Sequence, residues 1–359
     1  MQQNKQYTVT MLVYLTAMVL LVLLQIVASL GWFNGLSDEA LTVVSSVLPQ
    51  IVIMFGVPFV MLLSAQKING EPVSVRRVTE HVGWRKMSFK NVLLVFLLGV
   101  CLYLLNIFVA SFFGAILQAF GYQYTNTPNV FSGWGGLLLT IVLSAVLPAL
   151  CEEFLHRGVL LNGMIPQFGV HRSILLVSLL FGLMHMNVGQ FFYAAVLGWF
   201  FCVTALSARS LWASVIVHFV NNALATYFSY ANELQLPGVN ALNFLLGNPV
   251  FMMLTILVAV VGIAEILRHL ARENFERNLD AYTVRYLASQ NQFNTGDFDK
   301  IKDALPRAIK TMPSWKATMA YIETFNTPQP TKPLPKALLW AVCVLGTIIT
   351  VLSFMWGTW

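Results

Sequence analysis

Residues 137–161 read LLLTIVLSAVLPALCEEFLHRGVLL, an apolar run interrupted by two carboxylates, a histidine and an arginine. The run is long enough to cross a bilayer as a helix, so Glu152, Glu153 and Arg157 lie inside a predicted membrane span. An ionisable group there costs roughly 2.5–3.5 kcal/mol on insertion scales, and it usually faces the bundle interior or a water-filled cavity. The stretch therefore predicts a membrane protein with a functional site inside its helix bundle.

The composition of the whole chain agrees with this class. Hydrophobic residues make up 57% of the 359 residues and charged residues 10%, with a mean hydropathy of +0.71. Soluble domains of this size are far more polar, so we expect an all-α, polytopic helix bundle. Windows of about 19 residues give nine candidate spans. The predicted spans are 9–32, 41–64, 91–119, 136–160, 173–188, 190–207, 211–230, 248–267 and 337–357.

Three parts are expected along the chain. Residues 1–267 form the transmembrane bundle, with the site-bearing core at about 136–230. Residues 268–335 form a cytoplasmic segment, and residues 336–359 hold the final span. Within the cytoplasmic segment we expect an amphipathic helix continuing from the eighth span, short helices at 297–310 and 314–325, and a Pro-rich linker at 327–335.

The positive charges predict an orientation in the membrane. If the N-terminus is cytoplasmic, 20 of the 21 Lys and Arg residues fall in cytoplasmic segments, and the remaining one is Arg157. Asp38, Glu39 and Glu233 fall in the outer loops. This asymmetry is typical of integral membrane proteins and predicts a cytoplasmic N-terminus and an extracytoplasmic C-terminus. The net charge of +6 then reflects orientation in a lipid bilayer, with no nucleic-acid partner implied.

Two further polar pairs lie in later apolar segments, Phe181-x-x-x-His185 and His218-x-x-x-Asn222. At 1.5 Å per residue, Glu152, His185 and Asn222 each lie roughly 16–18 Å along their spans from the nearest cytoplasmic loop. Polar residues from three helices are therefore expected to meet in one layer that opens towards the cytoplasm.

Spacing within each helix assigns roles to these residues. Glu153 and Arg157 are four residues apart in the order that favours an ion pair within a helix. Glu152 is turned about 100° away and is the better candidate for a general base. His218 and Asn222 share a helix face and can offer two donors to a developing oxyanion. Structural hydrogen bonding between helices, or a proton relay, remains open for the same residues.

A metal site is a second way to use these groups. Glu152, His185 and His218, with Glu153, could supply nitrogen and oxygen ligands to a catalytic zinc. The chain has no His-Glu-x-x-His pattern, and the ligands would come singly from three helices. We therefore expect no cofactor and keep zinc as the alternative. A cysteine nucleophile at position 151 is weaker still, because an apolar setting disfavours the thiolate.

Three motifs along residues 136–230 carry a family resemblance. In order and spacing they resemble the CPBP family of CAAX proteases and bacteriocin-processing proteins, also called Abi, and the surrounding residues look like its bacterial branch. The motifs are Glu152-Glu153-x-x-x-Arg157, Phe181-Gly182-Leu183-Met184-His185 and His218-Phe219-Val220-Asn221-Asn222.

The resemblance implies an intramembrane endopeptidase in which a glutamate activates the attacking water. It implies a membrane-associated peptide or protein as substrate, such as a leader, bacteriocin or signalling peptide, in a bacterial cytoplasmic membrane. A non-proteolytic scaffold or bacteriocin-immunity protein of the same family is the alternative, and the oligomeric state is left open. His156 replaces the usual aromatic or aliphatic residue and could donate to the Glu152 side chain. The implied roles are Glu152 as base, His185 as its partner on the water, His218 and Asn222 as oxyanion donors, and Glu153 and Arg157 as structural or pKa-setting groups.

Overall fold

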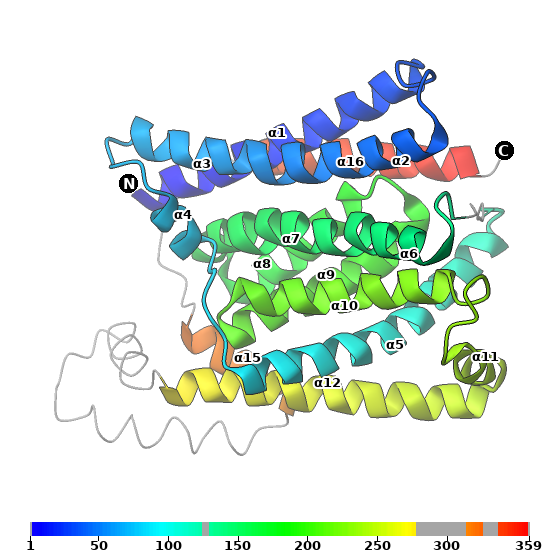
Figure 1. Ribbon diagram of the computed structural model, residues 1–359. Helices are drawn as coiled ribbons and strands as arrows, with labels where there is room; N and C mark the ends of the chain where they lie inside the picture. The colour runs from blue at the N-terminus through cyan, green and yellow to red at the C-terminus, as the bar shows by residue number, and fades with distance from the viewer. Residues whose placement is uncertain (1, 124–128, 278–313, 326–336, 358–359) are drawn as a thin grey trace.

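The computed structural model describes residues 2–123, 129–277, 314–325 and 337–357, and in these ranges the chain is helical with no strand. Figure 1 shows the long helices packed side by side, with most of their axes running across the view. The elements are α1 (Gln2–Ser29), α2 (Asp38–Val47), η1 (Leu48–Gly56), α3 (Val57–Ile68), α4 (Val75–His81), α5 (Phe89–Ala119), α6 (Gly133–Ile141), η2 (Val142–Val146), α7 (Leu147–Glu153), η3 (Phe154–Leu161), α8 (Asn162–Met184), α9 (Val188–Ala208), α10 (Leu211–Ser229), α11 (Val239–Gly247), α12 (Pro249–Arg277), α15 (Ser314–Phe325) and α16 (Ala337–Gly357).

The predicted polytopic helix bundle is confirmed, but the count of nine spans is not. Seven continuous helices in the described ranges are long and apolar enough to cross a membrane, and Ala337–Ser353 is a shorter apolar helix. One of the seven, Gly133–Met184, runs for 52 residues and covers the predicted span 136–160 and most of the span 173–188. Each of the other predicted spans overlaps a helix of the structure.

The expected connection at 161–172 is helical apart from a break at Gly169. This residue has φ 74° and ψ 173°, a backbone conformation that glycine adopts without steric penalty. Pro166, three residues earlier, lacks the N–H of a regular helical residue. The chain therefore turns at one residue between the two predicted spans, where the sequence had indicated a longer loop.

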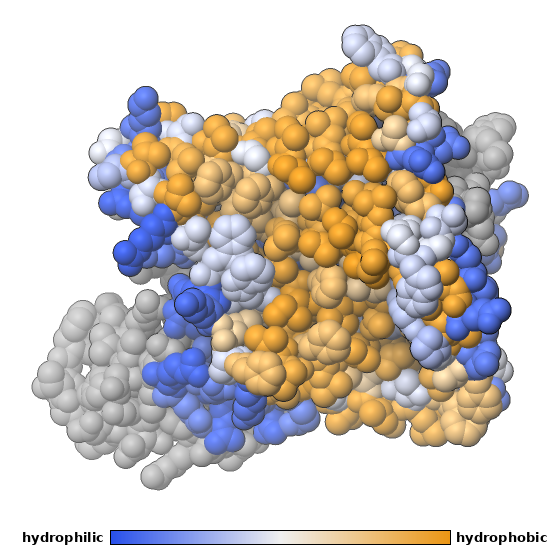
Figure 2. All heavy atoms as spheres, in the orientation of Figure 1, coloured by the Kyte–Doolittle hydropathy of each residue, from blue (hydrophilic) through white to orange (hydrophobic). Residues whose placement is uncertain are grey.

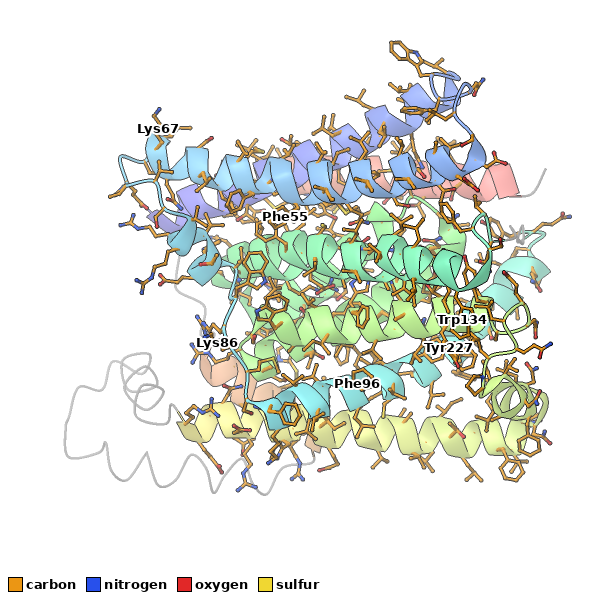
Figure 3. The ribbon with its side chains drawn as sticks, viewed as in Figure 1. Phe55, Lys67, Lys86, Phe96, Trp134 and Tyr227 are labelled. Atoms are coloured by element: carbon orange, nitrogen blue, oxygen red, sulfur yellow. The ribbon has the colours of Figure 1, made fainter. Side chains whose placement is uncertain are left out.

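The surface has the distribution expected of a bundle in a bilayer. Figure 2 shows a broad hydrophobic band across the middle, with hydrophilic residues at both ends of the helices. In Figure 3, Lys67 and Lys86 lie at one end, Trp134 and Tyr227 at the other, and Phe96 between them. Aromatic residues with a polar edge are enriched at membrane interfaces, so the two ends correspond to the two faces of the membrane.

Three stretches of π-helix, η1, η2 and η3, interrupt the α-helices around α7. Such stretches are rare and often accompany functional sites. All eight residues of η3 are buried. Segments η1 and η3 are held together by the Phe55 and Phe154 rings, whose centroids are 4.7 Å apart.

Of the predicted segment 268–335, the structure describes residues 268–277 and 314–325. The amphipathic helix expected beyond the eighth span is present to Arg277, and the short helix at 314–325 is also present. Ala271 and Phe275 pack against Ala317 and Tyr321, so α15 lies against the end of α12. The predictions of a helix at 297–310 and a linker at 327–335 lie outside the described residues.

Candidate active site

The diacid motif lies in the interior of the bundle, where α7 passes into η3. Glu152 is 8% exposed, Glu153 0% and Arg157 2%. Segments η1, α8, α9 and α10 surround them, and η1 and α10 supply polar side chains to the carboxylates. The sequence-based expectation that these charges face the bundle interior is correct.

Glu153 and Arg157 form the predicted ion pair. Arg157 Nη1 donates to Glu153 Oε1 at 2.7 Å, and Arg157 Nη2 donates to the carbonyl oxygen of Gly198 at 2.8 Å. The guanidinium carbon lies 4.5 Å from the ring centroid of Phe181 and 5.1 Å from that of Phe201. Arg157 thus joins three parts of the site. Its charge pairs with Glu153, one of its N–H groups binds α9, and the face of its guanidinium lies over the Phe181 ring.

His218 contacts both carboxylates, a link that the sequence analysis missed. Its Nδ1 lies 2.9 Å from Glu153 Oε1, and its Nε2 lies 3.9 Å from Glu152 Oε2. A carboxylate can only accept, so Nδ1 carries the hydrogen and Nε2 faces Glu152. Phe201 stacks on the imidazole with a centroid distance of 4.9 Å and holds its plane. Glu153 therefore orients His218 as well as pairing with Arg157.

Glu152 has a hydrogen-bond donor from outside the three motifs. Gln50, in η1, donates from Nε2 to Glu152 Oε1 at 2.8 Å. The two residues are 102 positions apart, and Gln50 is buried. One signal was present in the sequence: Gln50 is the only residue with an amide side chain in the predicted span 41–64.

His156 does not donate to the Glu152 carboxylate as expected. Its Nδ1 pairs with the backbone carbonyl oxygen of Glu152 at 2.8 Å, and its Nε2 lies 3.4 Å from the hydroxyl of Tyr14 in α1. A helical side chain leans back towards the preceding turn, which brings His156 within reach of that carbonyl. This departure from the family pattern therefore leaves the Glu152 side chain unaffected by a direct hydrogen bond.

His185 lies at the end of α8, beside an apolar cavity of about 310 Å³. Its Nδ1 pairs with the Phe181 carbonyl oxygen at 2.8 Å, which leaves Nε2 as the second ring nitrogen. The cavity is lined from α1, α2, η1 and the α8 end, including Met54, Met184 and Met186. Among the described residues, no hydrogen bond or ion pair joins His185 to Glu152.

A cavity beside His185 and a cavity beside Arg157 lie towards opposite ends of the bundle. The cavity beside His185 is lined by residues that flank the connection from α1 to α2, at the end away from Lys67 and Lys86 (Figures 1 and 3). A smaller cavity of about 130 Å³ reaches Arg157 from the α4 end. The opening of the polar layer towards the cytoplasm stays a prediction.

Asn222 is fixed by neighbouring polar groups. Its Nδ2 donates to the Ser144 carbonyl oxygen at 3.0 Å, and its Oδ1 accepts from Asn221 Nδ2 at 3.0 Å. Pro148, four residues after Ser144, has no N–H with which to satisfy that carbonyl. The proline in α7 therefore creates the acceptor that fixes Asn222, and only one amide hydrogen of Asn222 remains for a ligand.

The zinc alternative needs a cluster of donors. In the described ranges no group of three or more His, Cys, Asp and Glu side chains is arranged so that it could hold a metal ion. A catalytic zinc is usually held by three protein ligands. Glu152 and His218 come close enough to share an ion, but His185 does not join them in such a group.

The segment that carries the three motifs matches a known protein family. Residues 134–224 match the family model described as Rce1-like, type II CAAX prenyl endopeptidase. The match contains all three motifs and confirms the resemblance to the CAAX proteases for this segment. No curated protein and no solved structure matches the chain.

Proposed function

Because residues 134–224 are an Rce1-like segment of the CAAX protease family, we propose that the protein is an intramembrane endopeptidase in which Glu152 activates water. The observation that carries this proposal is the joint arrangement of Glu152, Glu153 and His218. One carboxylate orients the histidine, and the other faces the free edge of the same ring. This arrangement supports a base and an adjacent donor that act on one reacting group.

The proposed reaction begins with a water held by Glu152. The carboxylate takes one proton as the water oxygen attacks the carbonyl carbon of the scissile peptide bond, and the carbonyl oxygen becomes an oxyanion. The C–N bond then breaks, and the proton held by Glu152 passes to the leaving amine. The products are one new carboxyl terminus and one new amino terminus, so Glu152 is regenerated without a co-reactant.

His218 is proposed to stabilise the oxyanion. With Nδ1 bound to Glu153, it can donate from Nε2 only when both ring nitrogens carry hydrogen. Glu153 lies beside the ring at 2.9 Å from Nδ1 and is itself paired with Arg157 at 2.7 Å. Asn222 supports the oxyanion with its remaining amide hydrogen.

The cavity beside His185 is proposed to receive the substrate. Its volume of about 310 Å³ and its methionine-rich wall suit a bulky, flexible apolar group of a membrane-associated peptide. His185 lies on its wall and is proposed to assist the water from that side. A leader, bacteriocin or signalling peptide has the required chemistry.

The site is proposed to work without a metal. The donor arrangement supports this version, and zinc held by Glu152, His185 and His218 is the alternative. We further propose a bacterial cytoplasmic membrane as the location, with the N-terminus cytoplasmic. The positions of Lys67 and Lys86 at one end of the bundle support this orientation (Figure 3).

New amino termini in membranes test the proposal. Membranes from cells that express the wild-type chain, Glu152→Gln or Glu39→Gln are incubated, and newly formed peptide amino termini are labelled and sequenced. Glu39 is exposed, so its substitution is the matched control for loss of one carboxylate. Termini present with the wild type and Glu39→Gln but absent with Glu152→Gln are expected. Identical sets of new amino termini in the three membrane samples would overturn the peptidase proposal and favour the non-proteolytic scaffold.

A further inference from the structure

Gln50 reaches the site from a part of the chain that the family match does not cover. It belongs to η1, is 8% exposed, and donates from Nε2 to Glu152 Oε1 at 2.8 Å. A carboxylate oxygen is an acceptor only, so the nitrogen of the amide, and not its oxygen, faces Glu152. The orientation of the amide is therefore fixed by its partner.

The oxygen of the same amide is a buried acceptor with no partner. Gln50 Oε1 makes no hydrogen bond to any described residue, although the side chain is buried. Buried polar groups are normally satisfied, and exceptions in native structures call for a functional explanation. Oε1 shares its carbon with Nε2, so it lies close to the Glu152 carboxylate.

The segment that carries Gln50 is packed against the helix that carries Glu152. Pro49 precedes it and removes one backbone N–H from the π-helical segment. Phe55, from the same segment, packs against Phe154 and against Phe59 (centroid distances 4.7 and 5.8 Å), and Figure 3 shows it between the outer helices and α7. Segment η1 is thus anchored to η3, on the helix that carries Glu152.

We propose that Gln50 is a positioning residue of the peptidase site, which fixes the Glu152 carboxylate through Nε2 and orients the attacking water through Oε1. A water that attacks a carbonyl uses one lone pair and has two hydrogens. Glu152 takes one hydrogen, and Gln50 Oε1 accepts the other, so the lone pair is directed at the scissile carbonyl. The inference rests on the proposed function, because the water matters only if Glu152 is the base.

Steady-state kinetics test the positioning role. A peptide whose cleavage depends on Glu152 is assayed in proteoliposomes with the wild type and Gln50→Met, which keeps the side-chain length without its hydrogen bonds. A misplaced reacting group can cost on the order of 10²-fold, so kcat is expected to fall about 100-fold while KM changes less than about twofold. Gln118→Leu, an exposed glutamine on α5, is the control and should match the wild type.

Two variants separate this inference from the proposed function. Loss of cleavage with Glu152→Gln, combined with wild-type kcat for Gln50→Met, overturns the inference alone. Unchanged cleavage with Glu152→Gln overturns the proposed function. A raised KM with unchanged kcat for Gln50→Met would make Gln50 a binding residue and would also overturn the inference.

An unfolding cycle tests the contact without any substrate. The midpoints of unfolding are compared for Gln50→Met, Glu152→Leu and the double variant. If the amide satisfies the carboxylate, Gln50→Met lowers the midpoint with Glu152 present and has little effect once Glu152 is leucine. Additive shifts would show that the two side chains do not interact and would overturn the inference whatever the activity.

Discussion

Removal of Arg157 alone should destabilise the protein far more than removal of the arginine together with the charge of Glu153. Arg157 is fully buried, pairs with Glu153 at 2.7 Å, donates to the Gly198 carbonyl and lies over two aromatic rings. Arg157→Met removes the cationic partner of the buried Glu153 carboxylate and leaves it the side chains of His218 and Ser214. Breaking a buried pair in this way typically costs about 3–5 kcal/mol of unfolding free energy.

The double variant Glu153→Gln/Arg157→Met keeps an acceptor for His218 Nδ1 and has no uncompensated charge. Its main remaining loss is the donor to the Gly198 carbonyl, which costs about 1–3 kcal/mol when a buried acceptor is left unsatisfied. The double variant should therefore be more stable than Arg157→Met, by roughly 2 kcal/mol from the difference between these ranges.

Thiol accessibility measures this difference. Cys151 and Cys202 are buried in the bundle, so a thiol-reactive fluorophore reports unfolding as SDS is added to mixed micelles. The SDS content at the midpoint of unfolding should be highest for the wild type, lower for the double variant and lowest for Arg157→Met. If Arg157→Met is as stable as the double variant, the unpaired Glu153 carboxylate does not lower the unfolding free energy, and the reasoning is refuted.

Three further predictions concern the site and the orientation. His218→Ala should lower kcat by about 10²–10³-fold with little change in KM, since it removes a donor to the oxyanion; a change confined to KM would contradict this role. EDTA or phenanthroline should leave the cleavage rate nearly unchanged, and inhibition reversed by zinc, with stoichiometric metal in the protein, would establish the zinc alternative. Cysteine introduced at Lys86 should be labelled only from the cytoplasmic face and cysteine at Trp134 only from the outer face; the reverse pattern would invert the proposed orientation.

Features set by spacing within one helix were predictable from the sequence. The Glu153–Arg157 pair follows from a four-residue interval, and the apolar runs predicted the helices that cross the bundle. The segment 161–172 was predicted as a connection because the apolar windows ended the fourth span at residue 160 and began the fifth at residue 173. In the structure only Gly169 leaves the helical conformation, and the residues on either side of it stay in α8.

Features set by the rotation of one helix against another were not predictable. The contact of His218 Nδ1 with Glu153 depends on how α10 faces α7, and these residues are 65 positions apart. Gln50 lies in another helix and outside the three motifs, so no spacing rule connects it with Glu152. His156 illustrates the opposite case: it had the right interval to reach Glu152, but its ring reaches the backbone carbonyl first.

The most direct test of the account is the turnover of Glu152→Gln in purified form. The wild type and Glu152→Gln are reconstituted in proteoliposomes with a peptide that the wild type cleaves, and the rate of the first turnover is measured at saturating peptide. General-base catalysis typically contributes about 10²–10⁴-fold, so the variant should lose at least about 100-fold in rate while it still binds the peptide. A first-turnover rate within a few-fold of the wild type would contradict the assignment of Glu152 as the base.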